Sequence, residues 1–423
     1  TEVGLYLALL SMLLSPEFVI GGRGALAEGR EVVLRAEDLL LIVIAFSWFA
    51  KTAVNKELGL VVKTPLNRPI LAYILVTFVA TLLGYLTGTV KTGAGFLYVL
   101  KYVEYFVVYY MVVNNLQERA QAWRLATVAF LTAAVVSLVG IAQIPSGQRV
   151  SAPFEGEAGE PNTFSGYLLL MIALALGIAV ETRSTRIRIL SLAMIGVLVP
   201  PFIFTLSRAG YIAVVPMLLV FVLLGHRRRL MQGVLVGVIL IGPLLMAIAP
   251  EVVKTRVRGT FVAERGFQGT VRVGGVEFDP STSQRILAFK DGLEAWAKRP
   301  IFGYGVTGFG FMDAQYPKVL VEAGLVGFLA FGWLVWSLLS EVRSAFRALT
   351  VPEDQGLALG LLAGLFGLLV HALGSNTFII IRIMEPFWFF VAVVIMLPRL
   401  EAAMTEALPL RQTETWRTRP AGL

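Results

Sequence analysis

The sequence predicts an all-α polytopic membrane protein with about twelve transmembrane helices and one long extracytoplasmic loop that contains an amphipathic helix. Three observations predict this fold class. Of the 423 residues, 57% are hydrophobic and only 15% are charged, and the mean hydropathy is +0.77, which exceeds ordinary soluble usage. Apolar stretches recur along the chain, whereas residues 250–318 stay polar. No linker separates a soluble unit, so residues 1–423 form a single transmembrane domain that includes the loop 250–318.

Twelve apolar stretches are the predicted spans. A span needs about 20 predominantly apolar residues, so twelve of them leave room for one substantial loop and for no separate soluble domain. In chain order they are Val3–Leu14, Leu39–Val54, Pro69–Leu86, Phe96–Val113, Ala122–Ile144, Thr163–Val180, Ile189–Leu206, Gly210–Leu224, Met231–Ala249, Val319–Leu339, Gly356–Leu373 and Phe378–Leu397.

The short loops indicate how the spans are oriented, because Lys and Arg accumulate in cytoplasmic loops. With the N-terminus in the cytoplasm, the inside loops carry basic clusters at 51–68, 183–188 and 227–229, and the C-terminal tail adds more. The short loops on the opposite side carry few basic residues. Long loops cross the membrane largely regardless of charge, so we expect the loop 250–318 and the turn around Arg208 to face outward.

The loop 250–318 has an internal pattern, and loops of this length are usually functional or disordered. It carries charges of both signs, with Arg258 among its basic residues. From Ser283, which the spacing predicts as an N-cap, apolar residues recur at helical spacing: Ile286, Phe289, Leu293 and Trp296. At about 100° per residue, Arg285 lies within roughly 40° of Phe289 and Trp296. We therefore expect Arg285 on the buried or membrane-facing side, and we interpret the loop as a lid over an anionic ligand.

The charge balance narrows the class of partner. The net charge of +8 and the pI near 9.7 suit anionic lipid headgroups and a pyrophosphate group better than nucleic acid, and no nucleic-acid motif is present. The chain has no cysteine, which excludes disulfides and thiol chemistry. We expect membrane lipids as partners and no nucleic acid.

Arg208 lies in the short sequence Ser207-Arg208-Ala209-Gly210-Tyr211 between two predicted spans. So short a turn holds the guanidinium near the membrane plane, where a charge is costly and is usually retained for function. The alternative is that Arg208 snorkels to a lipid phosphate.

The run 303–310 is rich in glycine. It lacks the Gly-Lys-Ser/Thr ending of a P-loop and does not follow a strand. A backbone nest for phosphate and a plain re-entry turn both stay open for it.

Taken in order, several sets of residues resemble the O-antigen ligase and polymerase family. They are Ser207-Arg208-Ala209-Gly210, then Arg285 with Trp296 and Pro300, then Gly303 and Gly305, and then Glu322-Ala323-Gly324-Leu325-Val326-Gly327. Arg149 with Pro161-Asn162 looks like the family's upstream landmark. The resemblance extends from about Arg149 to the twelfth span. It rests on the order of these motifs, their spacing and their common side of the membrane more than on any single motif.

The resemblance implies an inverting, metal-independent membrane glycosyltransferase without a cofactor, acting at the outer face of the bacterial inner membrane. Its donor would be an oligosaccharide on undecaprenyl diphosphate. The acceptor would be a second lipid-linked glycan for a polymerase or lipid A–core for a ligase, with polysaccharide-assembly proteins as possible partners. The family's two arginine positions correspond to Arg208 and Arg285, which would hold the leaving diphosphate. Guanidinium groups bind such oxygens bidentately and stabilise the developing charge.

One position departs from the ligase pattern. Ligases of this family carry a His-Asn pair nine residues before the glutamate that matches Glu322, and this chain has Asp313 and Ala314 there. An aspartate can act as a general base on a sugar hydroxyl, so Asp313 is the candidate that activates the acceptor. The alternative is a loop aspartate that caps the next span. The missing histidine favours a polymerase, and a ligase stays open.

The remaining candidates for substrate binding are Arg149, Asn162, Arg258, Glu322, His371 and Arg382. His371 and Arg382 belong to the last two spans, where they could line the donor or acceptor cavity. An alternative for Arg382 is neutralisation by Glu385, three residues later on the same helix. Lys101 and Glu104 have the same spacing, and we expect them to pair.

Two other function classes stay open. A transporter of anions or of lipid-linked glycan would use the charged residues within the spans and helices broken at Pro200-Pro201 and Pro216. No inverted repeat is visible, which counts against it. A non-catalytic scaffold in a polysaccharide-assembly complex is the third class.

Overall fold

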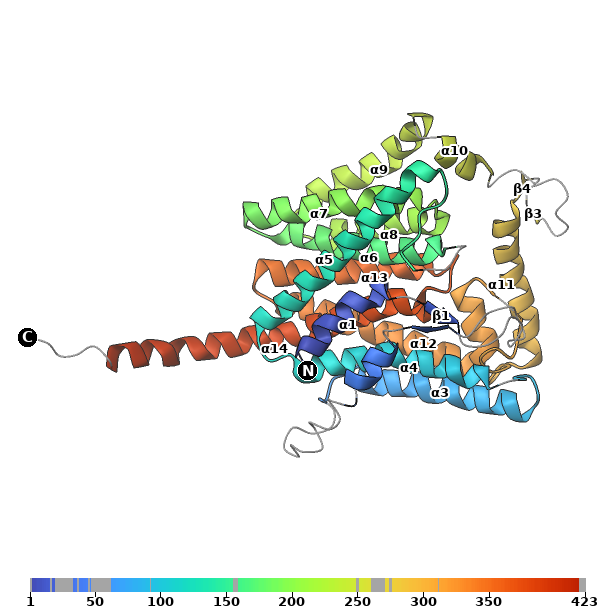
Figure 1. Ribbon diagram of the computed structural model, residues 1–423, viewed down its shortest axis with the longest axis horizontal. Helices are drawn as coiled ribbons and strands as arrows, with labels where there is room; N and C mark the ends of the chain where they lie inside the picture. Colours follow the sequence, from blue (N-terminus) through green and yellow to red (C-terminus); the bar gives the residue numbers. More distant parts are fainter. Residues whose placement is uncertain are drawn as a thin grey trace, which may run out of the picture.

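The chain forms a bundle of long helices with one helix lying across an end (Figure 1). The computed structural model describes residues 2–15, 17–19, 33–35, 38–44, 46, 62–91, 93–154, 159–248, 251–259, 271–273, 276–310 and 312–417. The first half contains the helices α1 (Glu2–Leu14), α3 (Asn67–Leu86), α4 (Ala94–Asn115), α5 (Arg119–Gln143), α6 (Pro161–Glu181), α7 (Thr185–Phe204) and α8 (Arg208–Leu224). The second half contains α9 (Arg228–Ile248), α10 (Glu251–Arg258), α11 (Pro280–Lys298), α12 (Gln315–Ala348), α13 (Pro352–His371) and α14 (Ile381–Arg417).

Short elements complete this list. Two 3-10 turns, Ile144–Ser146 and Thr377–Ile379, follow α5 and precede α14. Two antiparallel strand pairs, which the sequence analysis did not expect, join β1 (Glu17–Val19) to β2 (Val33–Arg35) and β3 (Arg272–Val273) to β4 (Val276–Glu277).

The fold is that of a polytopic α-helical membrane protein. Among the described residues, eight helices are long and apolar enough to cross a membrane: α3, α4, α5, α6, α7, α12, α13 and α14. They correspond to eight of the twelve predicted spans. Two further predicted spans are the shorter apolar helices α1 and α8, and α9 covers most of a third. The predicted span Leu39–Val54 lies largely outside the described residues.

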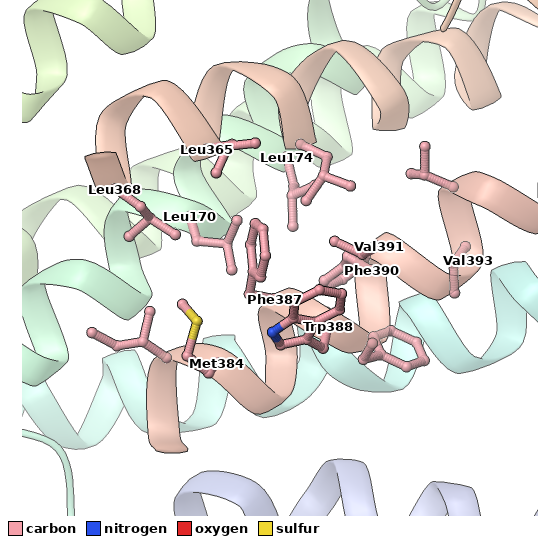
Figure 2. Close-up of a cluster of buried hydrophobic side chains, with 14 of the residues drawn as sticks. Leu170, Leu174, Leu365, Leu368, Met384, Phe387, Trp388, Phe390, Val391 and Val393 are labelled. Atoms are coloured by element: carbon pink, nitrogen blue, oxygen red, sulfur yellow. The ribbon is translucent and has the colours of Figure 1, made fainter. Parts of the chain in front are cut away.

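The centre of the bundle is formed by α6, α13 and α14. Leucines of α6 and α13 face Phe387, Trp388 and Phe390 of α14 (Figure 2). The contact between α6 and α13 depends on glycine, because a Cβ on Gly177 would lie 2.1 Å from the Gly356 carbonyl oxygen. Small residues let membrane helices approach closely enough for van der Waals packing, which is the main attraction between them in lipid.

Helix α12 is broken at Gly324, and the glycine-rich run packs into the break. Gly324 has φ 65° and ψ −167°, a conformation that is essentially restricted to glycine. The break leaves backbone N–H and C=O groups of α12 without helical partners, and the loop before α12 supplies new ones. Leu325 N–H donates to the Pro300 carbonyl at 2.8 Å, and Gly305 N–H donates to the Glu322 carbonyl at 2.8 Å. Such pairing is required where a membrane helix is interrupted.

The N–H groups of residues 304–308, in the middle of the glycine-rich run, are therefore already engaged. Val306 N–H donates to Thr81 Oγ1, Thr307 N–H donates to Glu322 Oε1 and Gly308 N–H donates to the Gly305 carbonyl. This supports the re-entry turn over a phosphate nest.

Helix α11 is the predicted loop helix, and it lies across the end of the bundle beside α12 (Figure 1). Its N-cap is Asp279, whose carboxylate accepts a hydrogen bond from Thr282 N–H at 3.1 Å. The prediction of Ser283 as N-cap was wrong, because Ser283 is buried inside the helix and accepts from Val271 N–H. The buried residues of α11 are Ser283, Gly292 and Ala295, whereas Leu293 of the apolar stripe is 54% exposed. A close approach to α12 requires small residues at the contact.

Polar contacts hold the two ends of the bundle. We call the end where α8 begins and α11 lies the arginine end, and the opposite one the far end. At the far end, Arg119 binds Asp354 through two hydrogen bonds of 2.6 and 2.9 Å. Within the membrane part, Lys101 pairs with Glu104 at 3.4 Å, as predicted, and also with Asp38.

Candidate active site at the arginine end

Arg208 is the first residue of α8 and is held by the N-cap of α11. Ser207 caps α8 by accepting a hydrogen bond from Gly210 N–H at 3.3 Å. The guanidinium of Arg208 donates from Nη1 to Asp279 Oδ1 at 2.9 Å and from Nη2 to Asp279 Oδ2 at 2.8 Å. The two side chains are 14% and 12% exposed. This is a bidentate, largely desolvated ion pair, the strong geometry for arginine and an oxyanion.

Asp279 has two tasks in this arrangement. Burial alone would raise the pKa of its carboxyl group, but the hydrogen bonds from Arg208 and Thr282 hold the pKa below its usual value. The same carboxylate therefore caps α11 and neutralises Arg208. The position of α11 at the bundle end is tied to the charge of Arg208.

Arg285 lies on α11 six residues after Asp279 and points toward the bundle. Its Nη2 donates to Asp313 Oδ2 at 3.3 Å and its Nη1 donates to Ser281 Oγ at 3.1 Å. The side chain of Arg285 is 18% exposed and that of Asp313 is 37% exposed. Arg285 Nε is buried and has no hydrogen-bond partner among the described residues. The expectation that Arg285 lies on an inward face holds.

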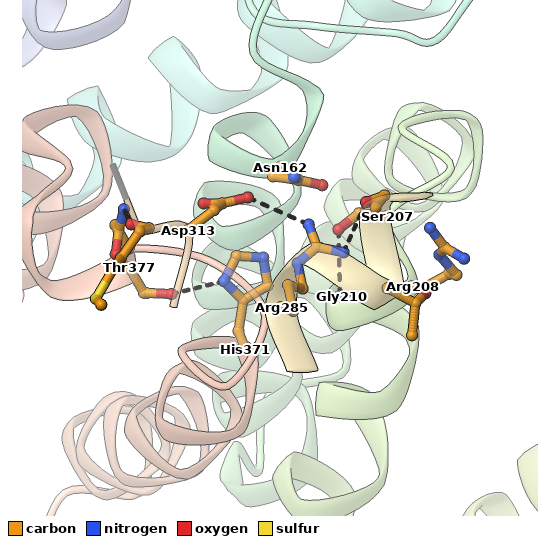
Figure 3. Close-up of polar contacts among 12 residues, drawn as sticks. Asn162, Ser207, Arg208, Gly210, Arg285, Asp313, His371 and Thr377 are labelled. Atoms are coloured by element: carbon orange, nitrogen blue, oxygen red, sulfur yellow. Dashed lines mark hydrogen bonds and ion pairs between the residues drawn. The ribbon is translucent and has the colours of Figure 1, made fainter. Parts of the chain in front are cut away.

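The turn after α13 brings the two arginine-bearing elements together. A Cβ added to Gly374 would lie 3.3 Å from Ala209 Cβ and 3.6 Å from Arg285 Nε. The residue next to Arg208 and the guanidinium of Arg285 therefore flank the same glycine. Figure 3 shows Arg285 between Asp313 and the start of α8, with Arg208 on the other side of Ser207.

His371 is the last residue of α13 and is fully buried in this region. Its Nδ1 shares a hydrogen bond of 2.8 Å with Thr377 Oγ1, and its Nε2 has no hydrogen-bond partner within the described part of the chain. Arg285 and the backbone of Asn162 are its polar neighbours. The ring lies between Thr377 and Arg285 (Figure 3).

Two more predicted residues shape the backbone around the site. Arg149 donates to the Thr205 carbonyl at 2.9 Å and to Asn162 Oδ1 at 3.1 Å, so it joins the start of α6 to the turn that presents Arg208. Arg382, buried at the start of α14, donates to the Pro153 and Phe154 carbonyls at 2.9 and 3.0 Å.

Strained backbone gathers at the same end. Among the described residues, the non-glycine residues with positive φ are Phe154, Leu206 and Thr307, at 62°, 51° and 65°. Leu206 precedes the Arg208 turn, Phe154 is held by Arg382 and Thr307 binds Glu322. Such conformations cost about 1–3 kcal/mol each and cluster at functional sites.

The structure does not bring every candidate to the two arginines. Glu322 is buried in α12, where it accepts hydrogen bonds from Lys318 Nζ at 2.6 Å and from Thr307 N–H at 3.2 Å. It lines a small cavity with Tyr73, Tyr102 and Gln315. Arg258 is exposed on α10, which packs on α9. Within the described ranges, no three His, Asp or Glu side chains are grouped so as to hold a metal ion.

Sequence reasoning missed Asp279, Ser281 and Thr377. The order Asp279-Pro280 could have been recognised, because aspartate is a favoured N-cap and proline is favoured at the first helical position. Nothing in the sequence signals the contact of Asp279 with Arg208, 71 residues earlier. Nothing in the sequence signals the contact of Thr377 with His371 either.

Comparison with known proteins bears on this region directly. A family model described as O-antigen ligase matches residues 201–332. The match includes Arg208, Asp279, Arg285, Asp313 and Glu322, and so covers both arginines and their carboxylate partners. A comparison with curated proteins found no match. Members of the matched family are membrane enzymes that act on lipid-linked glycans. Residues 201–332 are therefore similar to an O-antigen ligase family, and this similarity covers the part of the chain that carries both arginines.

Proposed function

We propose that the chain is a bacterial membrane glycosyltransferase that polymerises undecaprenyl-diphosphate-linked glycan at the outer face of the inner membrane. The observation that carries the proposal is that Ala209, next to Arg208, and the side chain of Arg285 meet at Gly374, and that both arginines belong to the family region. Each arginine already holds a carboxylate, Asp279 and Asp313. A guanidinium binds phosphate oxygens with the same fork that binds carboxylate oxygens.

The proposed reaction is a single displacement. The acceptor hydroxyl oxygen attacks the anomeric carbon, the bond from that carbon to the diphosphate breaks, and the electron pair leaves with the diphosphate. A single displacement inverts the anomeric centre. Arg208 and Arg285 stabilise the negative charge that develops on the leaving group, and such preorganised charge stabilisation is usually the largest catalytic contribution. The guanidiniums supply positive charge without a metal ion.

Asp313 takes the acceptor proton in this proposal. Its side chain is the more exposed member of the pair with Arg285, at 37% against 18%, so an acceptor hydroxyl can reach it. We expect Asp313→Asn to lower transfer by about 10²–10⁴-fold, the usual size of a general-base contribution. Donor binding should change little, because the leaving diphosphate contacts the arginines. A well-folded Asp313→Asn protein with full activity would remove Asp313 from the mechanism.

The other candidates shape or extend the site in this proposal. Arg149, Asn162 and Arg382 fix the loops beside the donor through their hydrogen bonds. His371 lies next to it on the α13 side and Arg258 offers an exposed charge to the glycan, whereas Glu322 acts from a distance, by holding the loop before α12 through Thr307.

Sidedness follows from the two ends of the bundle. Exposed basic residues gather at the far end, in the turns after α6 and α8 and in the first turns of α7 and α9: Arg183, Arg186 and Arg227–Arg229. Positive charge in short loops favours the cytoplasm, which supports an arginine end that faces outward. A cysteine introduced at exposed Lys290 and one introduced at exposed Arg227 should react with an impermeant maleimide from opposite sides of the membrane.

A polymerase and a ligase differ in the acceptor. A polymerase mutant should still cap lipid A–core with single repeats, whereas a ligase mutant should leave bare core and accumulate lipid-linked polymer. The position of Asp313, where ligases of the family carry histidine, favours the polymerase. The gel pattern of surface polysaccharide after gene deletion separates the two, and complementation by the same chain is the control.

Purified protein tests the enzyme itself. Detergent-solubilised chain should lengthen undecaprenyl-diphosphate-linked oligosaccharide and release undecaprenyl diphosphate without vesicles or a gradient. Arg208→Ala and Arg285→Ala should abolish both products. Substrate movement across a bilayer with no glycosidic bond formed would instead support a transporter.

A further inference from the structure

His371 is a buried histidine for which the proposed reaction has no role. It is 0% exposed, and it lies beside Arg285 at the arginine end. Its Nδ1 pairs with the hydroxyl of Thr377. Among the described residues the backbone of Asn162 lies near the ring, but no group has the geometry of a hydrogen bond to Nε2. A buried polar group without a partner is uncommon, because losing its hydrogen bond costs about 1–3 kcal/mol.

The hydrogen bond to Thr377 indicates which ring nitrogen carries the proton. Thr377 is also 0% exposed, and His371 Nδ1 is the only acceptor that the described residues offer its hydroxyl hydrogen. If Nδ1 carried the hydrogen, the threonine hydrogen would be buried without an acceptor. With the hydrogen on Nε2 and Thr377 donating to Nδ1, the unsatisfied donor is instead Nε2–H, which faces the side of Arg285 where a bound anion can accept from it, and we take this form. In this form Nε2 is a donor, so His371 does not serve as the acceptor base.

A second unpartnered donor lies next to it. Arg285 Nη1 and Nη2 are engaged by Ser281 and Asp313, but Nε is buried without a hydrogen-bond partner among the described residues. The space over Nε is kept by Gly374, whose added Cβ would approach it to 3.6 Å. The two unsatisfied N–H groups belong to neighbouring side chains, one of them cationic, and the pair is suited to an anionic acceptor.

We propose that Arg285 Nε–H and His371 Nε2–H form a two-donor seat for a non-bridging phosphate oxygen of the lipid diphosphate. The inference rests on the proposed function and adds His371 to the residues that contact the donor. A phosphate group fits because its several oxygens let one sit between the two N–H groups while others reach the remaining face of the site. Thr377 is a positioning residue, because it fixes the tautomer and the orientation of the ring.

The chain has only two histidines, His226 and His371, so ¹⁵N-histidine labelling reports on the seat with a built-in reference. His226 lies in the turn after α8 at the far end, where it binds Glu181. In solid-state NMR of the full chain in bilayers, His371 should show a protonated Nε2 and an unprotonated Nδ1 before any ligand is added. The opposite tautomer would overturn the inference whatever the protein does to glycans.

Undecaprenyl diphosphate is then the probe. We expect ¹⁵N–³¹P dipolar coupling at His371 Nε2 and none at His226. Measured binding of undecaprenyl diphosphate without coupling at His371 overturns the seat and leaves the proposed function standing. Coupling that appears with inorganic pyrophosphate but not with undecaprenyl diphosphate overturns the lipid diphosphate as the ligand and counts against the proposed function as well. If neither compound binds, the seat and the function both fall.

Substitutions supply the second readout. His371→Phe removes the donor, and the Kd for undecaprenyl diphosphate should rise about tenfold or more, as expected for a lost hydrogen bond to a charged group. His371→Gln offers an amide N–H at the position of Nε2 and should restore binding to within about threefold. His226→Gln is the matched control, and its Kd should equal that of the unchanged chain. Equal affinities for all the variants would overturn the seat.

Discussion

Asp279 both caps α11 and neutralises Arg208, and Asp279→Asn separates these two roles. We predict that this substitution makes donor binding tighter. Asparagine keeps a side-chain oxygen for Thr282 N–H and is as good an N-cap as aspartate, so α11 should keep its start. The substitution removes the negative charge that Arg208 holds through hydrogen bonds of 2.8 and 2.9 Å. Because the donor diphosphate needs the same guanidinium, it must first displace Asp279.

The size of the effect follows from that ion pair. Hydrogen bonds to charged groups contribute about 1.5–3 kcal/mol, and the pair is largely shielded from water at 14% and 12% exposure. Taking the lower value of about 1.5 kcal/mol, Asp279→Asn should lower the Kd for undecaprenyl diphosphate about tenfold. Asp279→Ala also removes the cap, at a cost of about 1 kcal/mol, so its gain in affinity should be smaller and its melting temperature lower than that of the asparagine variant.

Isothermal titration of the purified protein with undecaprenyl diphosphate measures the two Kd values, and thermal unfolding in the same detergent measures the loss of the cap. Lys290→Gln is the control for charge, because Lys290 is on the same helix and its side chain is 69% exposed. Weaker binding by Asp279→Asn, with unchanged thermal stability, would refute the reasoning. Asp279 would then be needed to orient Arg208 for the donor.

The remaining predictions concern charge, backbone and pH. Arg208→Lys should reduce transfer at least tenfold in single-turnover assays, because an ammonium cannot form the bidentate contact; activity equal to the original chain would contradict the role of the fork. Gly324→Ala should destabilise the protein by more than about 2 kcal/mol, since φ is 65° and the new Cβ would lie 2.2 Å from the Ile301 carbonyl oxygen, whereas Gly332→Ala in the same helix, with open space around it, should be neutral in thermal unfolding. Because the folded pKa of Asp279 is below its usual value, its stabilising charge is fully present above that usual value and is lost only as pH falls through the lowered pKa; the melting-temperature difference between the original chain and Asp279→Asn should stay constant from pH 8 to pH 5, and a decline within that range would contradict the depressed pKa.

The helices were predictable because each span is a local property of the sequence. Stretches such as Pro69–Leu86 and Thr163–Val180 are apolar over a length that only a spanning or fully buried helix requires, and α3 and α6 confirm them. Arg285 points inward as expected, although the apolar stripe from which this was predicted is not the face that packs on α12. These predictions needed no knowledge of what lies across from each residue.

The contacts were not predictable because they join distant parts of the chain. Ser283 has the side chain of an N-cap, but the helix starts four residues earlier, where Asp279 also meets Arg208. The apolar stripe of α11 was read as a packing face, yet the approach to α12 selects Gly292 and Ala295 instead. The glycine-rich run had two open interpretations until its N–H groups were found paired with α12 and α3.

The break in α12 has a consequence for how the site opens. Residues 300–305 form main-chain hydrogen bonds with both halves of that helix. The C-terminal end of α11, which leads into these residues, is therefore fixed to the membrane core. Its N-terminal half is held to the bundle by two ion pairs, Asp279 with Arg208 and Arg285 with Asp313. We expect α11 to pivot about its fixed C-terminal end when the Asp279–Arg208 ion pair breaks. A lipid-linked sugar should therefore enter between the starts of α8 and α11.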